Sequence, residues 1–200
     1  MNRIAGDAIR SDNRCMQPLS NSPRHYGLIA IALHWAMALL LLVLVVMGLY
    51  MVQLPDVGYD KVKITLILVH KALGLLALAA VLLRLAWRVG NALPELVAGL
   101  PQWQQVAARF VHLALYALML ALPMTGWLMS SAGGYPVPFF AWFELPHFIR
   151  VNEYWFRLYI AIHRWLAYAL MLVVALHVAA ALRHHWLMKD DTLRRMLPGR

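Results

Sequence analysis

Residues 162–186 read IHRWLAYALMLVVALHVAAALRHHW, an apolar stretch with polar side chains at two levels. Its middle is long and apolar enough for a membrane-spanning helix, which needs about 20 such residues. His163 lies near one end of the stretch and His177 near the other, although histidine is costly in hydrocarbon. Both side chains therefore need a partner that compensates for their burial.

The rest of the chain has the composition of an integral membrane protein. Of its 200 residues, 62% are hydrophobic and only 14% are charged, and the mean hydropathy is +0.64. Soluble domains of this length carry more charge and shorter apolar runs. Because lipid offers no partner to unpaired backbone groups, the long apolar stretches predict helices. These stretches cover residues 27–54, 64–87, 107–132 and 156–184.

An even number of spans with short connections predicts an all-α, up-down four-helix bundle in the membrane over residues 25–200. Residues 1–24 are polar and lack the apolar core of a signal peptide, so they predict a disordered cytoplasmic tail. The third connection, GGYPVPFFAWFELPHFIRVNEYWF (133–156), is rich in aromatic residues that prefer the membrane interface. It predicts a short aromatic lid on the periplasmic surface.

The net charge of +9 is dispersed around the spans, which favours membrane topology over nucleic-acid binding as its explanation. Basic residues gather in the N-terminal tail, the C-terminal tail and the second connection, to which Arg84, Arg88 and Arg109 are assigned. The positive-inside rule then puts both termini in the cytoplasm. Cys15 is the only cysteine, so the chain cannot form an internal disulfide or a cysteine-ligated cluster.

Four histidines fall into two pairs at matched depths. With the termini inside, His34 of the first span and His177 of the fourth share a cytoplasmic level. His70 of the second span and His163 of the fourth share a periplasmic level. The fourth span serves both pairs, because fourteen residues make about four turns and about 21 Å of rise. Two stacked haems, each held by two histidines, require this arrangement, whereas the alternative is a polar packing network.

A small residue follows each of these four histidines on the same helix face, which leaves room for a porphyrin ring. These residues are Ala38, Gly74, Ala167 and Ala181. His112 of the third span is followed by Tyr116 instead. It is therefore either a packing residue or a proton donor at a quinone pocket, with Trp35 as a further candidate beside that pocket.

Two basic residues, Lys71 and Arg164, directly follow the periplasmic histidines. Either they snorkel to the interface, or they contact haem propionates and attract an anion to the periplasmic mouth. His184 and His185 lie at the cytoplasmic end of the fourth span, where an interfacial role is favoured over a metal site.

Long segments of the chain resemble the bacterial cytochrome b561 family. They are IALHWAMALLLL (31–42), LVHKALGLLALAAVLLRLAWR (68–88), VHLALYALMLALPMTGWLMSSAGGYPVPFF (111–140) and HRWLAYALMLVVALHVAAALRHHWLMKDDTLRRMLPG (163–199). The resemblance covers roughly residues 25–199 and extends to the b subunits of Ni-hydrogenases and formate dehydrogenases in the same superfamily.

The resemblance implies two haems b per chain in a bacterial inner membrane. Their axial ligands would be His34 with His177, and His70 with His163. It also implies an enzyme that oxidises superoxide outside and reduces ubiquinone in the membrane. Alternatives are a cytochrome b anchor that passes electrons between quinone and a partner dehydrogenase, and a non-redox bundle or transporter with proton-relaying histidines. No motif indicates a homodimer, which stays open.

Overall fold

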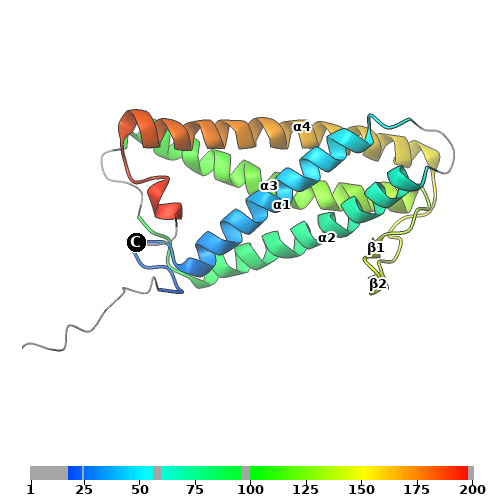
Figure 1. Cartoon of the computed structure of the whole chain (residues 1–200), viewed down its shortest axis with the longest axis horizontal. Helices are drawn as coiled ribbons and strands as arrows, with labels where there is room; N and C mark the ends of the chain where they lie inside the picture. Colours follow the sequence, from blue (N-terminus) through cyan, green and yellow to red (C-terminus); the bar gives the residue numbers. More distant parts are fainter. Residues whose placement is uncertain (1–17, 24, 56–59, 96–99, 198–200) are drawn as a thin grey trace, which may run out of the picture.

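The structure is a computed structural model that describes residues 18–23, 25–55, 60–95 and 100–197. Four long helices form an up-down bundle (Figure 1). They are α1 (Leu28–Met51), α2 (Lys61–Gly90), α3 (Gln102–Ala132) and α4 (Glu153–Arg183). Each is long and apolar enough to cross a membrane. The predicted membrane four-helix bundle is confirmed.

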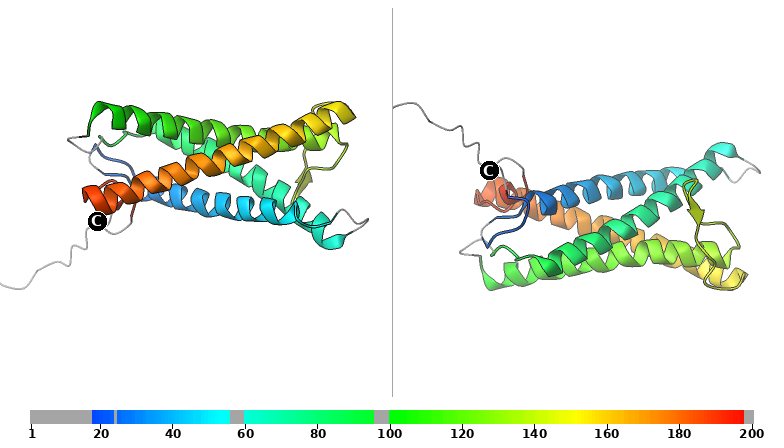
Figure 2. Two further views of the ribbon diagram at one scale, coloured as in Figure 1. Left: turned by 90° about the horizontal axis from the view of Figure 1, so that it is seen from above. Right: turned by 90° about the horizontal axis from the view of Figure 1, so that it is seen from below.

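The helices pack in chain order, with α1 on α2, α2 on α3 and α3 on α4. The start of α1, the end of α2, the start of α3 and the end of α4 gather at one end of the bundle, on the left of Figure 1. We call this the terminal end. The α3–α4 connection lies at the opposite end, which we call the hairpin end. Figure 2 shows that the helices cross obliquely between the two ends.

Polar side chains define where two of the helices begin. The Asp60 side chain accepts hydrogen bonds from the backbone at the start of α2, and Asn152 does the same for α4. Helix α2 continues to Gly90, so Arg84 and Arg88 lie inside it and their assignment to the second connection was wrong. Arginine allows this because its apolar stem lies along the helix while the charged head reaches polar surroundings.

The centre of the bundle is apolar and small. One buried side chain from each helix meets there: Met37, Val81, Met119 and Leu170. In α4 this side chain, Leu170, lies midway in sequence between His163 and His177. Many other large apolar side chains are exposed on the outside of the helices, as expected for a surface covered by lipid.

The aromatic connection forms a small hairpin at the hairpin end of the bundle. Strand β1 (Pro138–Phe139) pairs antiparallel with β2 (Phe143–Glu144) and lies against α2. The sequence predicted a lid here but not the strands, because two residues are too few to show alternation. The Lys71 ammonium donates to the Pro136 carbonyl at 2.8 Å and so attaches the connection to α2.

Three segments far apart in the sequence meet at the terminal end. Of the predicted tail, residues 1–17 and 24 lie outside the described residues, and residues 18–23 fold against the rest of the chain. The Leu28 amide donates to the Pro18 carbonyl at 3.0 Å, at the start of α1. The Arg195 guanidinium donates to the Glu95 carbonyl at 2.6 Å, which ties the C-terminal segment to the α2–α3 connection.

Candidate haem sites

The two histidine pairs predicted from depth are adjacent in the structure. The rings of His34 on α1 and His177 on α4 have centres 6.2 Å apart and planes at 65°. Those of His70 on α2 and His163 on α4 have centres 6.5 Å apart and planes at 75°. The first pair lies toward the terminal end and the second toward the hairpin end. Ligation of haem by these pairs stays a prediction.

Both separations fit one metal ion between two imidazoles. Each metal–nitrogen bond is about 2 Å and each ring centre lies roughly 1 Å behind its nitrogen, so two axial imidazoles have centres roughly 6 Å apart. His112 is only 5.3 Å from His177 between ring centres, which is too close for that arrangement. Within the described residues, no group of three or more His, Cys, Asp or Glu side chains could hold a bare ion. Two imidazoles alone suit haem, because the porphyrin supplies the remaining nitrogen ligands.

Each helix presents two positions, fourteen residues apart, at these two levels. Fourteen residues come to about four turns and about 21 Å, so both positions of a helix face nearly the same way. The positions are His34 and Gly48 on α1, His70 and Arg84 on α2, His112 and Gly126 on α3, and His163 and His177 on α4. The level near the hairpin end thus combines two histidines with two glycines, and the other level combines three histidines with an arginine.

The glycines bring helix backbone against the histidines at the hairpin end. A Cβ added at Gly48 would lie 3.5 Å from His70 Cε1, and one added at Gly126 would lie 3.4 Å from His163 Cε1. A Cβ added at Gly74, one turn after His70, would meet nothing within 4 Å. The other described residues thus leave the Gly74 position uncovered, and its use by a porphyrin stays a prediction.

Hydrogen bonds fix the orientation of the His163 ring. Its Nδ1 lies 3.1 Å from the Thr125 hydroxyl, and the ring also bonds the Leu122 carbonyl of α3. Bonding at Nδ1 fixes the ring and its tautomer, which leaves Nε2 to bind a metal. His70 Nδ1 is buried and has no hydrogen-bond partner among the described residues. A buried imidazole nitrogen in that state is expected to meet a ligand or water.

The terminal-end pair has a charged neighbour that the sequence prediction missed. Arg84 Nη2 lies 3.1 Å from His34 Nδ1. The Arg84 and Arg88 guanidinium groups lie 6.0 Å and 5.8 Å from the centre of the Tyr116 ring. A signal was present, since Arg84 follows His70 by the same fourteen residues that separate His163 from His177.

The structure separates the two predicted periplasmic cations. Lys71 is half-buried, bonded to the Pro136 carbonyl and 5.7 Å from the centre of the Tyr135 ring. Arg164 is exposed on α4, and its side chain makes no hydrogen bond or ion pair with the described residues. Lys71 thus holds the hairpin, while Arg164 keeps its charge available at the surface.

The two candidates for a quinone pocket have different surroundings. His112 is exposed beside His177, within electrostatic range of Arg84 and Arg88. The Trp35 ring lies edge-on to the His34 ring, with the ring centres 5.3 Å apart. The indole nitrogen of Trp35 donates to the Met196 carbonyl at 2.6 Å. Trp35 therefore holds the C-terminal segment next to the terminal-end pair.

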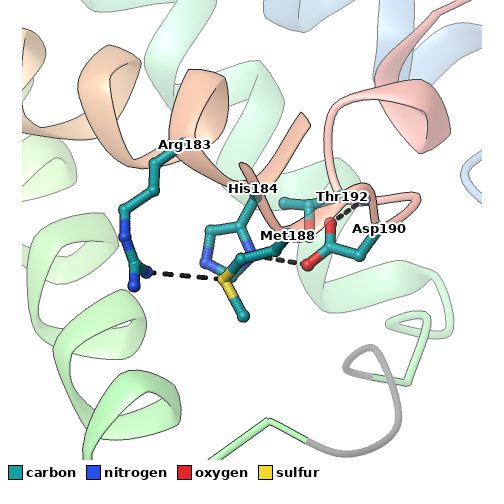
Figure 3. Close-up of polar contacts among 5 residues, drawn as sticks. All are labelled: Arg183, His184, Met188, Asp190 and Thr192. Carbon is teal, nitrogen blue, oxygen red and sulfur yellow. Dashed lines mark hydrogen bonds and ion pairs between the residues drawn. The ribbon is translucent and has the colours of Figure 1, made fainter. Parts of the chain in front are cut away.

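His184 fixes the turn that carries the C-terminal segment back over the bundle (Figure 3). Its Nδ1 lies 2.5 Å from the Asp190 carboxylate, which also accepts from the Thr192 amide at 2.9 Å. Between them, Lys189 adopts the left-handed conformation at φ 54°. Partial burial raises the pKa of Asp190, but the hydrogen bonds from Thr192 and His184 outweigh it and lower the pKa. His185 Nδ1 is buried nearby without a partner among the described residues.

Known proteins resemble this chain over almost its whole length. The family described as prokaryotic cytochrome b561 matches residues 25–199. Cytochrome b561 homolog 2 of Escherichia coli K12 is 36% identical over 89% of this chain and 94% of its own length. Cytochrome b562 of Cereibacter sphaeroides is 30% identical over 88% of this chain and 96% of its own length. The probable superoxide oxidase CybB of Yersinia pestis is 27% identical over 88% of this chain and 97% of its own length. This chain belongs to the prokaryotic cytochrome b561 family, whose members are multi-pass membrane proteins that transfer electrons with haem b.

Proposed function

We propose that this chain binds two haems b and carries electrons from superoxide, on the periplasmic side, to ubiquinone in the bacterial inner membrane. One observation carries the proposal: histidine pairs with ring centres 6.2 Å and 6.5 Å apart lie at two levels of one bundle. Haem b between two histidines supplies one-electron transfer and leaves no iron position open to dioxygen.

The protein between the two levels is apolar. The cluster of Met37, Val81, Met119 and Leu170 fills the centre of the bundle with apolar side chains. The levels are about 21 Å apart along a helix, since they are fourteen residues apart at 1.5 Å each. A rigid, apolar interior of that length keeps the two redox centres fixed relative to one another.

Positive charge near the hairpin end would bring superoxide to the proposed haem between His70 and His163. Superoxide is an anion, and cations that line an entrance raise the local concentration and the association rate of an anionic substrate. Lys71 and Arg164 each follow a histidine of the hairpin-end pair, and Arg164 is exposed. A relative named as a probable superoxide oxidase supports the substrate, at 27% identity.

Quinone reduction needs protons as well as electrons, and the terminal-end level offers a proton donor. Two superoxide anions, one ubiquinone and two protons give two dioxygen molecules and one ubiquinol, which balances charge and atoms. His112 lies beside His177 on an exposed part of α3, so it can pass protons to a quinone that approaches from lipid.

The experiment is superoxide-driven quinone reduction by the purified, haem-loaded chain in nanodiscs with a soluble ubiquinone analogue. Lys71→Ala with Arg164→Ala is expected to slow the reaction about tenfold at low salt and to flatten its salt dependence. Arg183→Ala with Lys189→Ala removes the same charge at the opposite end and should change neither. A haem-loaded chain that reduces quinone only with a partner dehydrogenase would replace this proposal with the anchor role.

A further inference from the structure

Arg84 occupies the position in α2 that faces the terminal-end histidine pair. It follows His70 by fourteen residues, so it lies nearly on the same face of α2 and about 21 Å further along. The two histidines of its level come from α1 and α4, and Arg84 Nη2 is 3.1 Å from His34 Nδ1. Arg84 thus stands beside the pair without belonging to it.

Within the described part of the chain, no carboxylate pairs with this arginine or with Arg88, one turn later. Among the described residues, neither forms an ion pair with Asp or Glu, and both guanidinium groups instead face the Tyr116 ring. An aromatic face compensates a cation only partly. Charged side chains in membrane helices are normally paired with an anion or reach a polar boundary. Half-buried Arg84 therefore fits a site for an anion from outside the chain.

The hydrogen bond to His34 also competes with metal ligation. Arginine can only donate, so His34 Nδ1 must accept, which leaves the proton of a neutral imidazole on Nε2. Ligation through Nε2 requires that nitrogen to be free of its proton, with Nδ1 donating instead. Arg84 must then release His34 and bond to another acceptor close by.

Carboxylate is the acceptor that suits this geometry. A guanidinium fork matches the two oxygens of a carboxylate, and haem carries two propionates. We propose that Arg84, assisted by Arg88, forms the carboxylate-binding site for the propionates of the haem at the His34–His177 level. This inference rests on the proposed function. The other source of anionic oxygens is a phospholipid headgroup, which exposed Arg88 could also contact.

The test compares haem with its dimethyl ester, which lacks the propionate charges. Full-length apoprotein in nanodiscs of neutral lipid is loaded with each cofactor, and dissociation from the terminal-end site is followed optically in a His163→Ala background. The unsubstituted Arg84 protein is expected to release the ester about tenfold faster than haem. Arg84→Gln should release both at the faster rate, and Arg84→Lys should give an intermediate result. Arg109→Gln, an exposed arginine on α3, should retain the full difference.

A second readout is the midpoint potential of that haem in protein purified with both haems bound. Removal of a nearby positive charge disfavours the reduced form, so Arg84→Gln should lower the potential and Arg109→Gln should not. Equal release of haem and ester by the unsubstituted protein would overturn the inference. Release that depends on anionic lipid but not on the ester would assign the site to a headgroup instead. Haem absent from both sites would refute the proposed function itself.

Discussion

At the scale of single residues, neighbours decide what each histidine does. His163 bonds Thr125 and the Leu122 carbonyl, His34 bonds Arg84, and His112 bonds the backbone of Ala108 on its own helix. Hydrogen bonds to the non-ligating nitrogen set tautomer and ring direction, so residue type alone does not identify a ligand.

Replacement of His177 should remove one haem and replacement of His112 should remove none. His177→Ala would delete an axial ligand of the proposed terminal-end haem, so the purified protein should contain one haem per chain. His112→Ala should keep two, because its ring centre is too close to His177 for a shared iron. Pyridine haemochrome absorbance divided by protein concentration measures the ratio. Full haem content in His177→Ala would assign that site to other residues.

Removal of the Thr125 hydroxyl should loosen the hairpin-end haem while leaving the other unchanged. Thr125→Val keeps the shape of the side chain but deletes the partner of His163 Nδ1, and loss of such a contact costs about tenfold in metal affinity. Thr125→Ser keeps the hydroxyl and is the matched control. Haem transfer to excess apomyoglobin measures the release rate. If valine and serine variants released haem equally, the hydroxyl would have no orienting role.

The sequence predicted which histidines pair but not the side-chain contacts around them. The pairs of His34 with His177 and of His70 with His163 follow from helix period and depth, which are local regularities. The Thr125–His163 bond depends on the rotation of two helices about their axes, which composition does not specify. Arg84 was missed because its charge suggested the end of a span, although its position repeats the fourteen-residue spacing.

At the scale of secondary structure, each long helix carries two positions that lie fourteen residues apart and face nearly the same way. The bounds of the predicted spans differ from those of the helices by a few residues, with the largest difference at the start of α3, because lipid demands long apolar runs but does not fix where each helix begins. The hairpin was not predicted, since its two-residue strands have no periodicity and its aromatic residues suggested only an interface. The docking of the C-terminal segment on Trp35 depends on a long-range contact that no local pattern encodes.

A large side chain on the ligand face of α2 should exclude the hairpin-end haem. Gly74→Leu fills the open space one turn from His70, so we expect one haem per chain in place of two. Gly90→Leu makes the same change at the end of the same helix, also with nothing within 4 Å of the added Cβ, and should retain both. The measurement is the number of haems per chain in the two purified variants. Two haems in Gly74→Leu would mean that the porphyrin does not use this space.

The C-terminal turn should open in acid. The pKa of Asp190 lies below its ordinary value of 3.8, because hydrogen bonds from Thr192 and His184 outweigh its partial burial. The contribution of this carboxylate to folding is therefore present above pH 3.8 and is lost as the pH falls through the lowered value. Pepsin digestion between pH 2 and 5 should show faster cleavage after residue 188 at the acid end of that range.

Two neighbouring substitutions separate this effect from general acid damage. Asp190→Asn should give fast cleavage across the whole range, since the pair with His184 is already lost. Asp191→Asn, at an exposed carboxylate with 53% of its side chain accessible, should retain the pH dependence. The same cleavage profile in both variants would show that Asp190 does not hold the turn.

At the scale of the whole molecule, four helices hold two histidine pairs at two levels, with an apolar cluster between the levels. The family match and the four long helices establish a membrane cytochrome b. We propose that each of the two histidine pairs binds one haem, which gives one haem at each level. Direction of electron flow, quinone reduction and the role of Arg84 all depend on that count.

The most direct measurement is the haem content and electron paramagnetic resonance spectrum of the purified, oxidised chain. We expect two haems b per polypeptide, both low-spin, because each iron would have two histidine ligands and no open position. His34→Ala and His70→Ala should each remove one of the two signals. A single haem per chain, or a high-spin signal from the unsubstituted protein, would contradict the two-level arrangement.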